Sequence, residues 1–374
     1  MTHPHYRIAI AGCGAGIAES HLRALAQLTD RAHIVGMCDV SRERGQVRAT
    51  QADVPFFTDH CAMLEATQPD VIAICTPHPF HASIALDAFA RGAHVLTEKP
   101  MAIQVGDADR MIAAGAAAGR LLVVNFQQRF RPVVERARVF VQAGEVGQLM
   151  RVQVSESWYR TAKYFSEVPW RGTWRGEGGA ILMNQSPHTM DLMCHLAGQP
   201  VLVWGWAKTR LHAIECEDTA QAMLEFAGGV PGYFTSSTAE AIPAPHQRIL
   251  IVGERGALEI GDSRLTLTRF KADVRAFAAV SPSPWNAPEM TQEVLDLPGD
   301  GGGHLAVYRD LFDAIEHNRQ PRVSGQEALM SLELANAIIY SAHTGGSVKL
   351  PLDRAAYSDL LRQFQTQPQA RTQA

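Results

Sequence analysis

The stretch HVLTEKPMA, residues 94–102, contains Lys99, and no other lysine occurs in the chain before Lys163. Arginine is the usual cation of the chain, because only five of its 34 basic residues are lysines. An arginine keeps its proton at any working pH, whereas burial or neighbouring charge can bring the pKa of a lysine from about 10.4 toward about 7–8. Lys99 is therefore a candidate for proton exchange, and the alternative is that its position reflects chance.

A glycine-rich stretch, GCGAGIAESH at residues 12–21, follows an apolar run and opens an amphipathic one. Glycines let the backbone turn tightly and approach a pyrophosphate, which the N-terminus of the next helix binds. The match to GxGxxG is imperfect, because Ile17 stands where the third glycine belongs. A plain structural turn is the alternative, but the strand-to-helix context favours a dinucleotide site. The expected cofactor-binding residues of this turn are Gly12, Cys13, Gly14, Ala15, Gly16 and Ile17.

An acidic residue, Asp39, ends the next apolar run. A carboxylate at this place can accept both hydroxyls of the adenosine ribose and would repel a 2′-phosphate, so it favours NAD over NADP. Ser41 and Arg42 are near enough to bind the cofactor as well and to weaken that preference. The alternative for this charged segment is the solvated start of a helix.

The first part of the chain, up to about residue 125, alternates short β-rich apolar runs with longer amphipathic runs of helical spacing. The apolar runs are residues 7–12, 32–39, 70–77, 92–100 and 120–126. The helical runs are residues 16–28, 41–52, 81–92 and 105–119. This alternation predicts βαβ units and a doubly wound parallel sheet, which binds ligands at the carboxyl ends of its strands. Gly12, Asp39, Thr76 and Glu98 stand at such ends.

The second part, residues 126–362, has the long alternating runs of antiparallel strands. They cover residues 147–160, 201–210, 218–238 and 246–270, and helical patterns cover 187–197, 304–317 and 326–343. We expect an α+β domain built on a large, mostly antiparallel open sheet. Helices on one face of such a sheet leave the other face to be covered, so a homodimer or homotetramer is expected. Residues 280–290 are expected to form a surface loop and residues 363–374 a disordered tail.

Composition narrows the class of partner. The 374 residues are 46% hydrophobic and 19% charged, and the net charge is −4, which offers no electrostatic basis for binding nucleic acid or a membrane surface. The six cysteines form no CxxC pair and have no zinc spacing, so we expect reduced buried thiols. The N-terminal sequence lacks the pattern of a signal peptide, and no apolar run is long enough to span a bilayer. A cytoplasmic enzyme with a small-molecule substrate is expected.

With the glycine turn, CTPHPFH at 75–81, TEKP at 97–100 and EGGAILMNQSPHTMDLM at 177–193, the chain resembles the Gfo/Idh/MocA family of oxidoreductases, named after glucose-fructose oxidoreductase and inositol dehydrogenase. The resemblance extends from Arg7 to about Leu352. It implies a Rossmann domain at residues 1–125 and an α/β domain whose open sheet forms dimers or tetramers. It also implies a nicotinamide cofactor and a sugar, a cyclic polyol or a derivative as substrate.

The resemblance assigns roles to particular residues. Lys99 matches the family lysine that contacts the reacting hydroxyl or carbonyl beside the nicotinamide, and Glu98 matches the residue that contacts the nicotinamide ribose. His188 matches the general base, for which an ordinary pKa near 6.5 is suitable. Relatives such as the inositol enzyme have Asp four residues before this histidine, whereas this chain has Asn184, which carries no charge to orient an imidazolium.

Other residues are expected at the site from the same resemblance. Without it, His78 and His81 would be two incidental imidazoles at the start of a helix. The further cofactor-binding residues are Cys75, Thr76, Pro77, His78, His81, Asn125, Trp170 and Arg171, and Lys99 contacts both cofactor and substrate. The further substrate-binding residues are Gln127, Arg129, Tyr159, Arg171 and Asn184.

Three functions stay open from the sequence. The favoured one is an NAD-dependent dehydrogenase that oxidises a secondary hydroxyl of a sugar, glycoside or cyclic polyol to a ketone, or runs the reverse reduction. The first alternative is a redox-neutral glycoside hydrolase that retains its NAD, and the second is a non-catalytic dinucleotide-binding sensor. A metal site at His188, Asp191 and His195 is conceivable from their helical spacing, but no cysteine or second acidic cluster completes a ligand shell, so no metal is expected.

Overall fold

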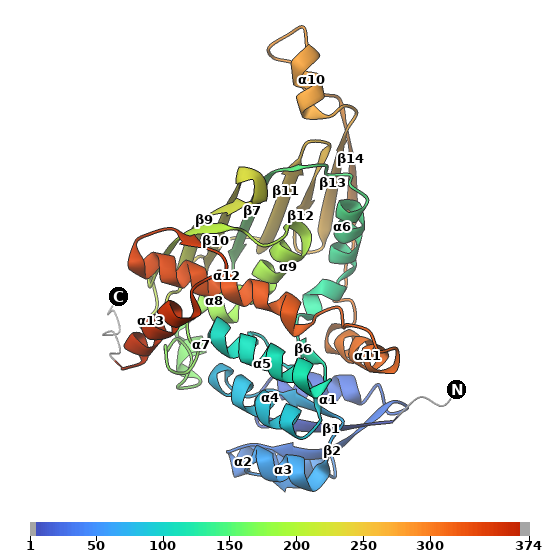
Figure 1. Ribbon diagram of the computed structural model, residues 1–374, viewed down its shortest axis with the longest axis vertical. Helices are drawn as coiled ribbons and strands as arrows, with labels where there is room; N and C mark the ends of the chain where they lie inside the picture. The colour runs from blue at the N-terminus through green and yellow to red at the C-terminus, as the bar shows by residue number, and fades with distance from the viewer. Residues whose placement is uncertain (1–4, 367–374) are drawn as a thin grey trace. The chain divides into compact units, whose positions relative to one another are not determined.

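The computed structural model describes residues 5–366, which fold into two compact units (Figure 1). Unit 1 consists of the chain up to Gln127 together with Arg175–Gly178 and Gly302–Leu332. Unit 2 consists of Gln128–Trp174, Gly179–Gly301 and the chain from Glu333 onward. The sequence pattern suggested two consecutive domains that meet at residues 125 and 126, and the structure differs because two later segments return to unit 1.

Unit 1 is built on a six-stranded parallel sheet in the order β3-β2-β1-β4-β5-β6. Its strands are β1 (Tyr6–Ala11), β2 (Ala32–Cys38), β3 (Phe56–Phe57), β4 (Val71–Ile74), β5 (His94–Thr97) and β6 (Leu122–Val124). Its helices are α1 (Ala18–Leu25), α2 (Arg42–Gln51), α3 (His60–Thr67), η1 (His78–Phe80), α4 (His81–Ala90), α5 (Val105–Ala118) and α11 (Gly303–Glu316). The strand order reverses direction at β1 and β4, as in a doubly wound fold, which confirms the expected class.

The strands of this sheet are buried on both faces, because helices flank it. Every residue of β4 and β5 is buried, and only Arg7 is exposed in β1. Continuous apolar strands are typical of a parallel sheet covered on both sides. The apolar runs of the sequence predict every strand of this sheet except β3, whose two residues are too few for a periodic pattern.

Helix α11 joins unit 1 although the whole segment from η2 to β14 separates it from β6 along the chain. The ring of Phe312 on α11 stacks on Tyr6 of β1 with centroids 4.6 Å apart. The guanidinium of Arg31 donates to Asp313 at 2.8 Å and to Glu316 at 2.7 Å. These contacts attach α11 to the amino-terminal part of unit 1.

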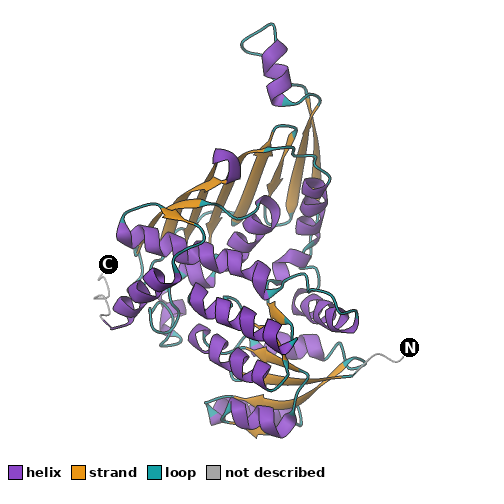
Figure 2. Ribbon diagram, in the orientation of Figure 1, coloured by secondary structure: helices purple, strands orange, loops and turns teal. Residues whose placement is uncertain are grey.

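Unit 2 is built on a nine-stranded sheet in the order β14-β13-β12-β11-β7-β10-β9-β8-β15 (Figure 2). Neighbouring strands are antiparallel except for the parallel pair β10 and β7. Its strands are β7 (Leu149–Ser157), β8 (Leu202–Lys208), β9 (Thr219–Phe226), β10 (Val230–Ser237), β11 (Gln247–Gly253), β12 (Gly256–Ile260), β13 (Arg264–Phe270), β14 (Met290–Asp296) and β15 (Val348–Lys349). The expected large, mostly antiparallel sheet is therefore confirmed.

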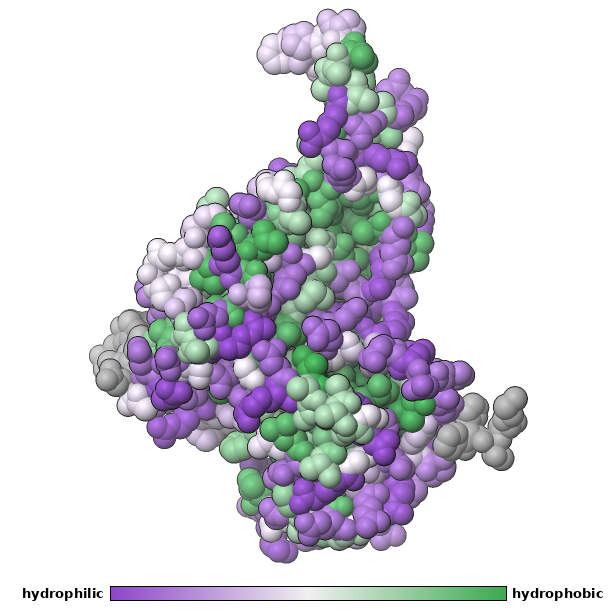
Figure 3. Space-filling model, viewed as in Figure 1, coloured by the Kyte–Doolittle hydropathy of each residue, from purple (hydrophilic) through white to green (hydrophobic). Residues whose placement is uncertain are grey.

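The helices of unit 2 are η2 (Gln127–Phe130, which begins at the last residue of unit 1), α6 (Pro132–Gln142), α7 (Ala162–Ser166), α8 (Ile181–Asn184), α9 (Pro187–Ala197), η3 (Ala227–Gly229), α10 (Val274–Val280), α12 (Gly325–Thr344, which begins in unit 1) and α13 (Arg354–Thr366). Of these, α6, α8, α9 and α12 cover one face of the sheet, whereas α10 lies apart from it (Figure 1). Helix α12 approaches β8 so closely that a Cβ on Gly205 would lie 2.3 Å from the carbonyl oxygen of Ile338. Figure 3 views the side that carries the helices, where hydrophilic and hydrophobic residues are intermixed.

The other face of the sheet exposes apolar side chains. Trp204, Met223 and Tyr233 lie directly opposite one another on β8, β9 and β10, and their exposed fractions are 44%, 65% and 38%. A row of large apolar residues on adjacent strands is an unusual surface for an isolated domain. The alternation of buried and exposed residues along β9 produces this row and places Ala222 and Leu224 on the buried face.

Two segment predictions have different outcomes. Residues 281–289 lie between α10 and β14 and belong to neither helix nor strand, as expected of a loop. The prediction of a disordered tail over 363–374 is wrong for residues 363–366, which end helix α13; residues 367–374 lie outside the described residues. The helix extends this far because Phe364 is buried against Trp174, with ring centroids 4.5 Å apart. Between residues 5 and 366, no helix combines the length and the apolar character needed to span a bilayer.

A buried carboxyl group, Glu217, fixes the start of α8. Its Oε1 accepts the backbone N–H groups of Ala180 and Leu182 at 3.0 and 3.1 Å, while Oε2 is buried with no hydrogen-bond partner among residues 5–366. Burial raises the pKa of Glu217 from 4.5 to about 7, and Asp218 adds to the increase. The folded protein therefore holds this proton more tightly than the unfolded chain does.

This pKa predicts a pH-dependent stability. The stabilising contribution of the protonated carboxyl is complete below pH 4.5 and is lost as the pH rises through about 7. Glu217→Gln keeps an oxygen for the two N–H groups but does not titrate. Urea unfolding should show that the wild type loses up to about 3 kcal/mol of stability relative to Glu217→Gln between about pH 5 and pH 8. Parallel pH profiles for the two proteins would contradict the assignment.

Candidate active site

The glycine turn follows β1 and crosses close to the start of the loop after β4. Gly12 has φ +82°, and a Cβ there would lie 2.7 Å from backbone atoms of Cys75 and Thr76, so only glycine fits. Gly16 faces open space, with no atom within 4 Å of a Cβ built on it. The turn thus combines a tight crossing at Gly12 with an uncovered backbone at Gly16, as a site for a diphosphate requires.

Two thiols flank this turn, at Cys13 and Cys75. Both are buried, and burial raises the pKa of Cys13 to about 12 and that of Cys75 well above its ordinary value. Neither side chain is a nucleophile at neutral pH. Their backbone amides, which bond to Cys38 and Ala11, contribute to the shape of the turn instead.

Asp39 lies at the carboxyl end of β2, next to the glycine turn. Its Oδ2 accepts the N–H of Gly14 at 2.7 Å and its Oδ1 accepts the N–H of Ser41 at 2.8 Å. These two bonds orient the carboxylate, and each oxygen keeps capacity for a second donor. Arg42 is exposed, with its guanidinium 5.7 Å from the ring centroid of Phe56.

Arg48 is a residue that the sequence analysis missed. Its guanidinium, from α2, donates to the carbonyl oxygens of Cys13, at 2.5 Å, and Ala15. Arg48 therefore fixes the backbone of the glycine turn and adds positive charge beside a site for a diphosphate. Its position in the stretch SRERGQVR carried no signal, since a basic residue on an exposed helix is ordinary.

The loop after β4 carries Thr76, Pro77 and His78, which the family resemblance placed beside the cofactor. His78 is buried and its Nδ1 lies 3.3 Å from the carbonyl oxygen of Glu177. Burial lowers the pKa of His78 well below its ordinary value, so the ring is neutral. The ring of His81 bridges the carbonyl oxygens of Thr76 at 2.8 Å and Pro100 at 2.9 Å. His81 thereby connects the loop after β4 to the loop that follows Lys99.

Glu98 and Lys99 follow β5. Glu98 is buried, and its Oε1 accepts the side-chain N–H of Asn125 at 2.6 Å. Its Oε2 accepts the backbone N–H of Lys99 at 3.3 Å. Lys99 is half-buried at the carboxyl end of the strand, where the topology of a doubly wound sheet brings ligands. The predicted pair therefore occupies the edge of the sheet that also carries Gly12 and Thr76.

Polar atoms at this edge are buried without a partner, and they test whether a cofactor fits. Within residues 5–366, Thr76 Oγ1, Asn125 Oδ1 and Gln127 Oε1 have no hydrogen-bond partner. Buried polar atoms are rarely left in this state, because each such atom costs about 1–3 kcal/mol. A dinucleotide with ribose hydroxyls and a carboxamide would satisfy them, so the residues present at this edge fit NAD.

In unit 2, His188 is the second residue of α9, and a buried ion pair anchors this helix. Arg129, fully buried on η2, donates from Nε and Nη2 to the two carboxylate oxygens of Asp191 at 2.8 and 2.7 Å. This two-point contact fixes η2 against α9. Arg129, which the resemblance placed near substrate or nicotinamide, thus directs two donors to a side chain of its own unit.

A buried polar network holds the N-terminal turn of α9 on the sheet. Thr189 donates to Glu156 of β7 and accepts from Gln247 of β11 at 2.6 Å. Glu156 also accepts from Ser236 of β10 at 2.8 Å, and Ser236 bonds to Ser186 at 2.7 Å. His188 is thereby carried on a turn of helix that three strands hold in place.

Asn184 ends α8, four residues before His188, and α8 packs against α9. The backbone N–H of Asn184 donates to the carbonyl of Ala180 at 2.9 Å. As noted above, Glu217 holds the start of this short helix. Of the three residues whose helical spacing made a metal site conceivable, Asp191 pairs with Arg129 and His195 contacts Arg138.

Tyr159, Trp170 and Arg171 lie on loops of unit 2. Tyr159 is 48% exposed after β7. Arg171 donates to the carbonyl of Tyr164 at 2.8 Å, and its guanidinium lies 4.0 Å from the ring centroid of Tyr164. Glu167 accepts from the same side chain at 3.3 Å. In this structure the arginine therefore organises its own loop.

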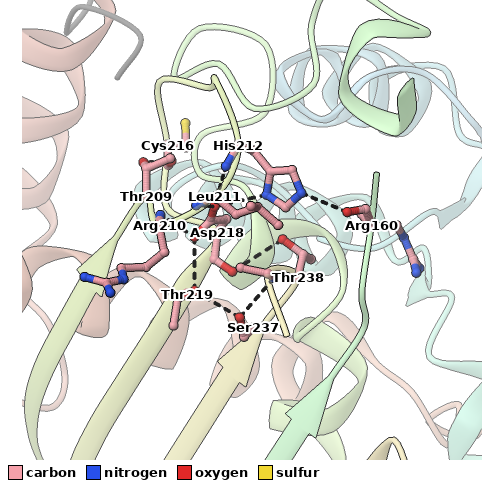
Figure 4. A network of polar contacts seen from close by, with 11 residues as sticks. Arg160, Thr209, Arg210, Leu211, His212, Cys216, Asp218, Thr219, Ser237 and Thr238 are labelled. Atoms are coloured by element: carbon pink, nitrogen blue, oxygen red, sulfur yellow. Dashed lines mark hydrogen bonds and ion pairs between the residues drawn. The ribbon is translucent and has the colours of Figure 1, made fainter. Parts of the chain in front are cut away.

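Asp218 connects these loops to the segment between β8 and β9 (Figure 4). Its carboxylate accepts the backbone N–H groups of Arg210, Leu211 and His212, at 2.8–2.9 Å, and contacts Nδ1 of His212 at 3.0 Å. Nε2 of that ring lies 2.9 Å from the carbonyl of Arg160.

The segment fixed by Asp218 also reaches the loop that carries Trp170 and Arg171. The carbonyl of Gly172 accepts the N–H of Glu215 at 2.9 Å and that of Cys216 at 3.2 Å. The carboxylate of Asp218 thus fixes the segment between β8 and β9. The loops at residues 159–160 and 170–172 are both hydrogen-bonded to this segment. Nothing in the sequence marks Asp218 for this role, because an acidic residue at a strand start is common.

Comparison with known proteins identifies the family. The model described as an oxidoreductase family with an NAD-binding Rossmann fold, Gfo/Idh/MocA, matches residues 6–126, and the model of the Gfo/Idh/MocA C-terminal domain matches residues 134–259. The chain belongs to the Gfo/Idh/MocA family. It is accordingly an NAD(P)-dependent oxidoreductase, and unit 1 contains its NAD-binding sheet.

Several Gfo/Idh/MocA proteins and related structures are similar over nearly the whole chain. D-apiose dehydrogenase of Paraburkholderia graminis is 27% identical over 93% of this chain and 91% of its own. D-glucoside 3-dehydrogenase of Escherichia coli is 24% identical over 94% of this chain and 99% of its own. The crystal structure of the WlbA dehydrogenase from Chromobacterium violaceum with NADH and UDP-GlcNAcA has 28% identity and a TM-score of 0.82, and the alignment covers 94% of this chain and 98% of that one.

The position of Asp39 predicts a preference for NAD(H) over NADP(H), because its oriented carboxylate would repel a 2′-phosphate. Asp39→Asn retains one acceptor oxygen and removes the charge, so it should narrow the difference between the two affinities. Isothermal titration of both cofactors measures this, and Asp30→Ala, an exposed acidic residue of unit 1, is the control. Equal or tighter binding of NADP(H) by the wild type would refute the role of Asp39.

Proposed function

We propose that the protein is an NAD-dependent dehydrogenase that oxidises a secondary hydroxyl of a sugar, glycoside or cyclic polyol to a ketone, or catalyses the reverse reduction. The observation that carries the proposal is the edge of the unit 1 sheet, where Glu98 and Lys99 follow β5 beside the glycine turn. The names of the similar D-apiose and D-glucoside dehydrogenases support a carbohydrate-type substrate.

The residues that would hold NAD follow from this geometry. The backbone of the glycine turn suits the diphosphate, Asp39 the adenosine ribose and Glu98 the nicotinamide ribose. Asn125 and Thr76 offer their unpartnered buried oxygens to the same ligand. Bound NAD would supply the acceptor for the hydride that leaves the carbon of the substrate.

Lys99 acts on the reacting oxygen in this proposal. As a hydroxyl becomes a carbonyl, negative charge develops on its oxygen, and an ammonium group nearby stabilises that charge. Lysine also exchanges its proton, which arginine does not do. His188 takes the hydroxyl proton as general base, and the buried pair of Arg129 with Asp191 and the network at Thr189 keep its helix in place.

This role of Lys99 predicts the effect of a substitution. Lys99→Met should leave the Kd for NADH nearly unchanged and lower kcat by about 10² or more, the range for the loss of a proton-transfer or oxyanion partner. Lys99→Arg should also be slow, because it retains charge without proton exchange. Lys163→Met, on an exposed helix of unit 2, is the control. A Lys99→Met enzyme with near-normal kcat would show that the lysine at position 99 reflects chance and has no role in the reaction.

The reaction class is tested by following the cofactor. A dehydrogenase incubated with a substrate sugar and excess NAD should accumulate NADH in proportion to the ketone formed. A glycoside hydrolase that retains its NAD would instead release aglycone from a nitrophenyl glycoside without net NADH. In heavy water its product would carry deuterium beside the transiently oxidised carbon. Aglycone release with deuterium and without NADH would overturn the proposal, as would NAD binding without turnover of any sugar or polyol tested.

We also propose that the open sheet face forms a homodimer or homotetramer interface. The exposed row of Trp204, Met223 and Tyr233 offers apolar surface on three adjacent strands. A glutamate at position 223 would bury a charge in such an interface. Light scattering should therefore report a smaller particle for Met223→Glu than for the wild type, while Val280→Glu, on the exposed helix α10, should leave the size unchanged. A monomeric wild type would rule the interface out.

A further inference from the structure

Glu98 lies in a cluster of buried side chains that no role described so far explains. Besides Asn125, its Oε1 contacts Nε2 of His21 at 3.0 Å and Nε2 of His304 at 3.1 Å. The histidines come from α1 and α11, and the side chain of His21 is fully buried while that of His304 is 12% exposed. Three side-chain donors therefore converge on one carboxylate oxygen.

The protons of the cluster can be placed from its contacts. The hydroxyl of Tyr308 lies 2.9 Å from Nδ1 of His21. Burial lowers the pKa of His21, so its ring is neutral, and burial raises the pKa of Tyr308 well above its ordinary value, so its hydroxyl keeps the proton. Tyr308 therefore donates to Nδ1, and the Nε2–H of His21 donates to Glu98.

The charge of Glu98 results from a balance. Burial raises the pKa of its carboxyl, but the hydrogen bonds from His21 and His304 outweigh burial and hold the pKa well below its ordinary value. Glu98 is therefore a buried carboxylate anion at working pH. The other titratable groups that act on it or feel its charge are Cys75, His78, His81 and Tyr308.

The two carboxylate oxygens have different surroundings. Oε1 accepts the three side-chain donors, whereas Oε2 accepts the backbone N–H of Lys99 at the longer distance of 3.3 Å. Oε1 is crowded by its three donors, whereas Oε2 carries one long hydrogen bond and keeps a lone pair for a ligand hydroxyl. The cluster thus turns one oxygen inward and leaves the other at the edge of the sheet.

We propose that His21 and His304 are positioning residues that keep Glu98 as an oriented carboxylate, so that Oε2 accepts hydrogen bonds from the ribose hydroxyls on the nicotinamide side of NAD. The inference rests on the role of Glu98 in the proposed function. Charge-assisted bonds to the ribose hold the nicotinamide half, whereas the adenosine half binds at Asp39 and does not depend on the cluster.

The same three side chains lie close enough together to hold a metal ion, which is the competing explanation. Two histidines and a glutamate are a common ligand set for zinc. However, Asn125 donates to the same oxygen at 2.6 Å, where a bound cation would have to displace it. Both ring nitrogens of His21 and Nε2 of His304 already have a hydrogen-bond role with Tyr308 or Glu98, so the geometry favours positioning by hydrogen bonds.

The experiment measures NADH and ADP binding by fluorescence and calorimetric titration between about pH 5.5 and 8. The variants are His304→Leu, which removes a donor, and His304→Gln, which keeps an N–H. For His304→Leu we expect NADH to bind about tenfold more weakly at the lower pH than at the higher one, because Glu98 then protonates within this window. The wild type, His304→Gln and the control His317→Leu, at the exposed end of α11, should show a flat profile.

ADP lacks the nicotinamide ribose, so its affinity should be the same for all variants, which also shows that unit 1 is folded. If His304→Leu fails to fold, Tyr308→Phe replaces it as the test. This substitution removes the O–H that sets the tautomer of His21. It should weaken NADH binding by about threefold and leave ADP affinity unchanged. Should whichever of the two folds bind NADH as the wild type does at every pH, the inference is overturned.

Two further outcomes separate the possible failures. Tight zinc binding by the wild type that His304→Leu abolishes would establish a metal site and overturn the inference. Glu98→Gln should weaken NADH binding at every pH, because its neutral amide does not titrate. If Glu98→Gln leaves NADH affinity unchanged, the role of Glu98 in the proposed function fails, and this inference fails with it. If only Glu98→Gln weakens NADH, the role of Glu98 stands and that of the histidines does not.

Discussion

A carboxylate that is taken out of water requires donors, and this requirement organises unit 1. The anion of Glu98 receives N–H groups from α1, from the end of β6 and from α11. An uncompensated buried charge costs several kcal/mol, so these three segments must come together before the edge of the sheet can take its final form. The return of α11 to unit 1 is therefore part of the same arrangement that places Lys99, rather than an accessory to the sheet.

Unit 2 uses the same principle with different partners. Asp191 is neutralised by Arg129, and Asp218 is satisfied by three consecutive backbone N–H groups and an imidazole. The first arrangement fixes the helix that carries His188, and the second fixes the loops next to Tyr159 and Arg171. Lys99 and His188, which are assigned to proton transfer, are half-buried, while the groups that orient their surroundings are buried and polar. Such groups specify geometry more than they add stability.

The sequence predicts a site residue correctly placed at a strand end when the signal lies in the neighbouring residues. Gly12 and Asp39 sit at strand ends that apolar runs already mark, and Lys99 follows such a run directly. The sequence does not predict the contacts of a side chain whose partner lies far along the chain. The sequence does not show that α11 places His304 beside Glu98. Nor does it show that Arg129 pairs with the distant Asp191. The helical end of α13 was missed because burial of Phe364 against Trp174 is a tertiary effect.

The separation of Glu98 from His304 has a consequence for biosynthesis. The two residues are 206 positions apart, and a ribosome that adds about 5–20 residues per second needs roughly 10–40 s to cover that length. During this interval the chain up to Gln127 has emerged with its sheet strands but without α11, and the carboxyl of Glu98 has one histidine donor instead of two. Most of unit 2 is therefore synthesised before the buried charge of the nascent nucleotide-binding sheet is fully compensated.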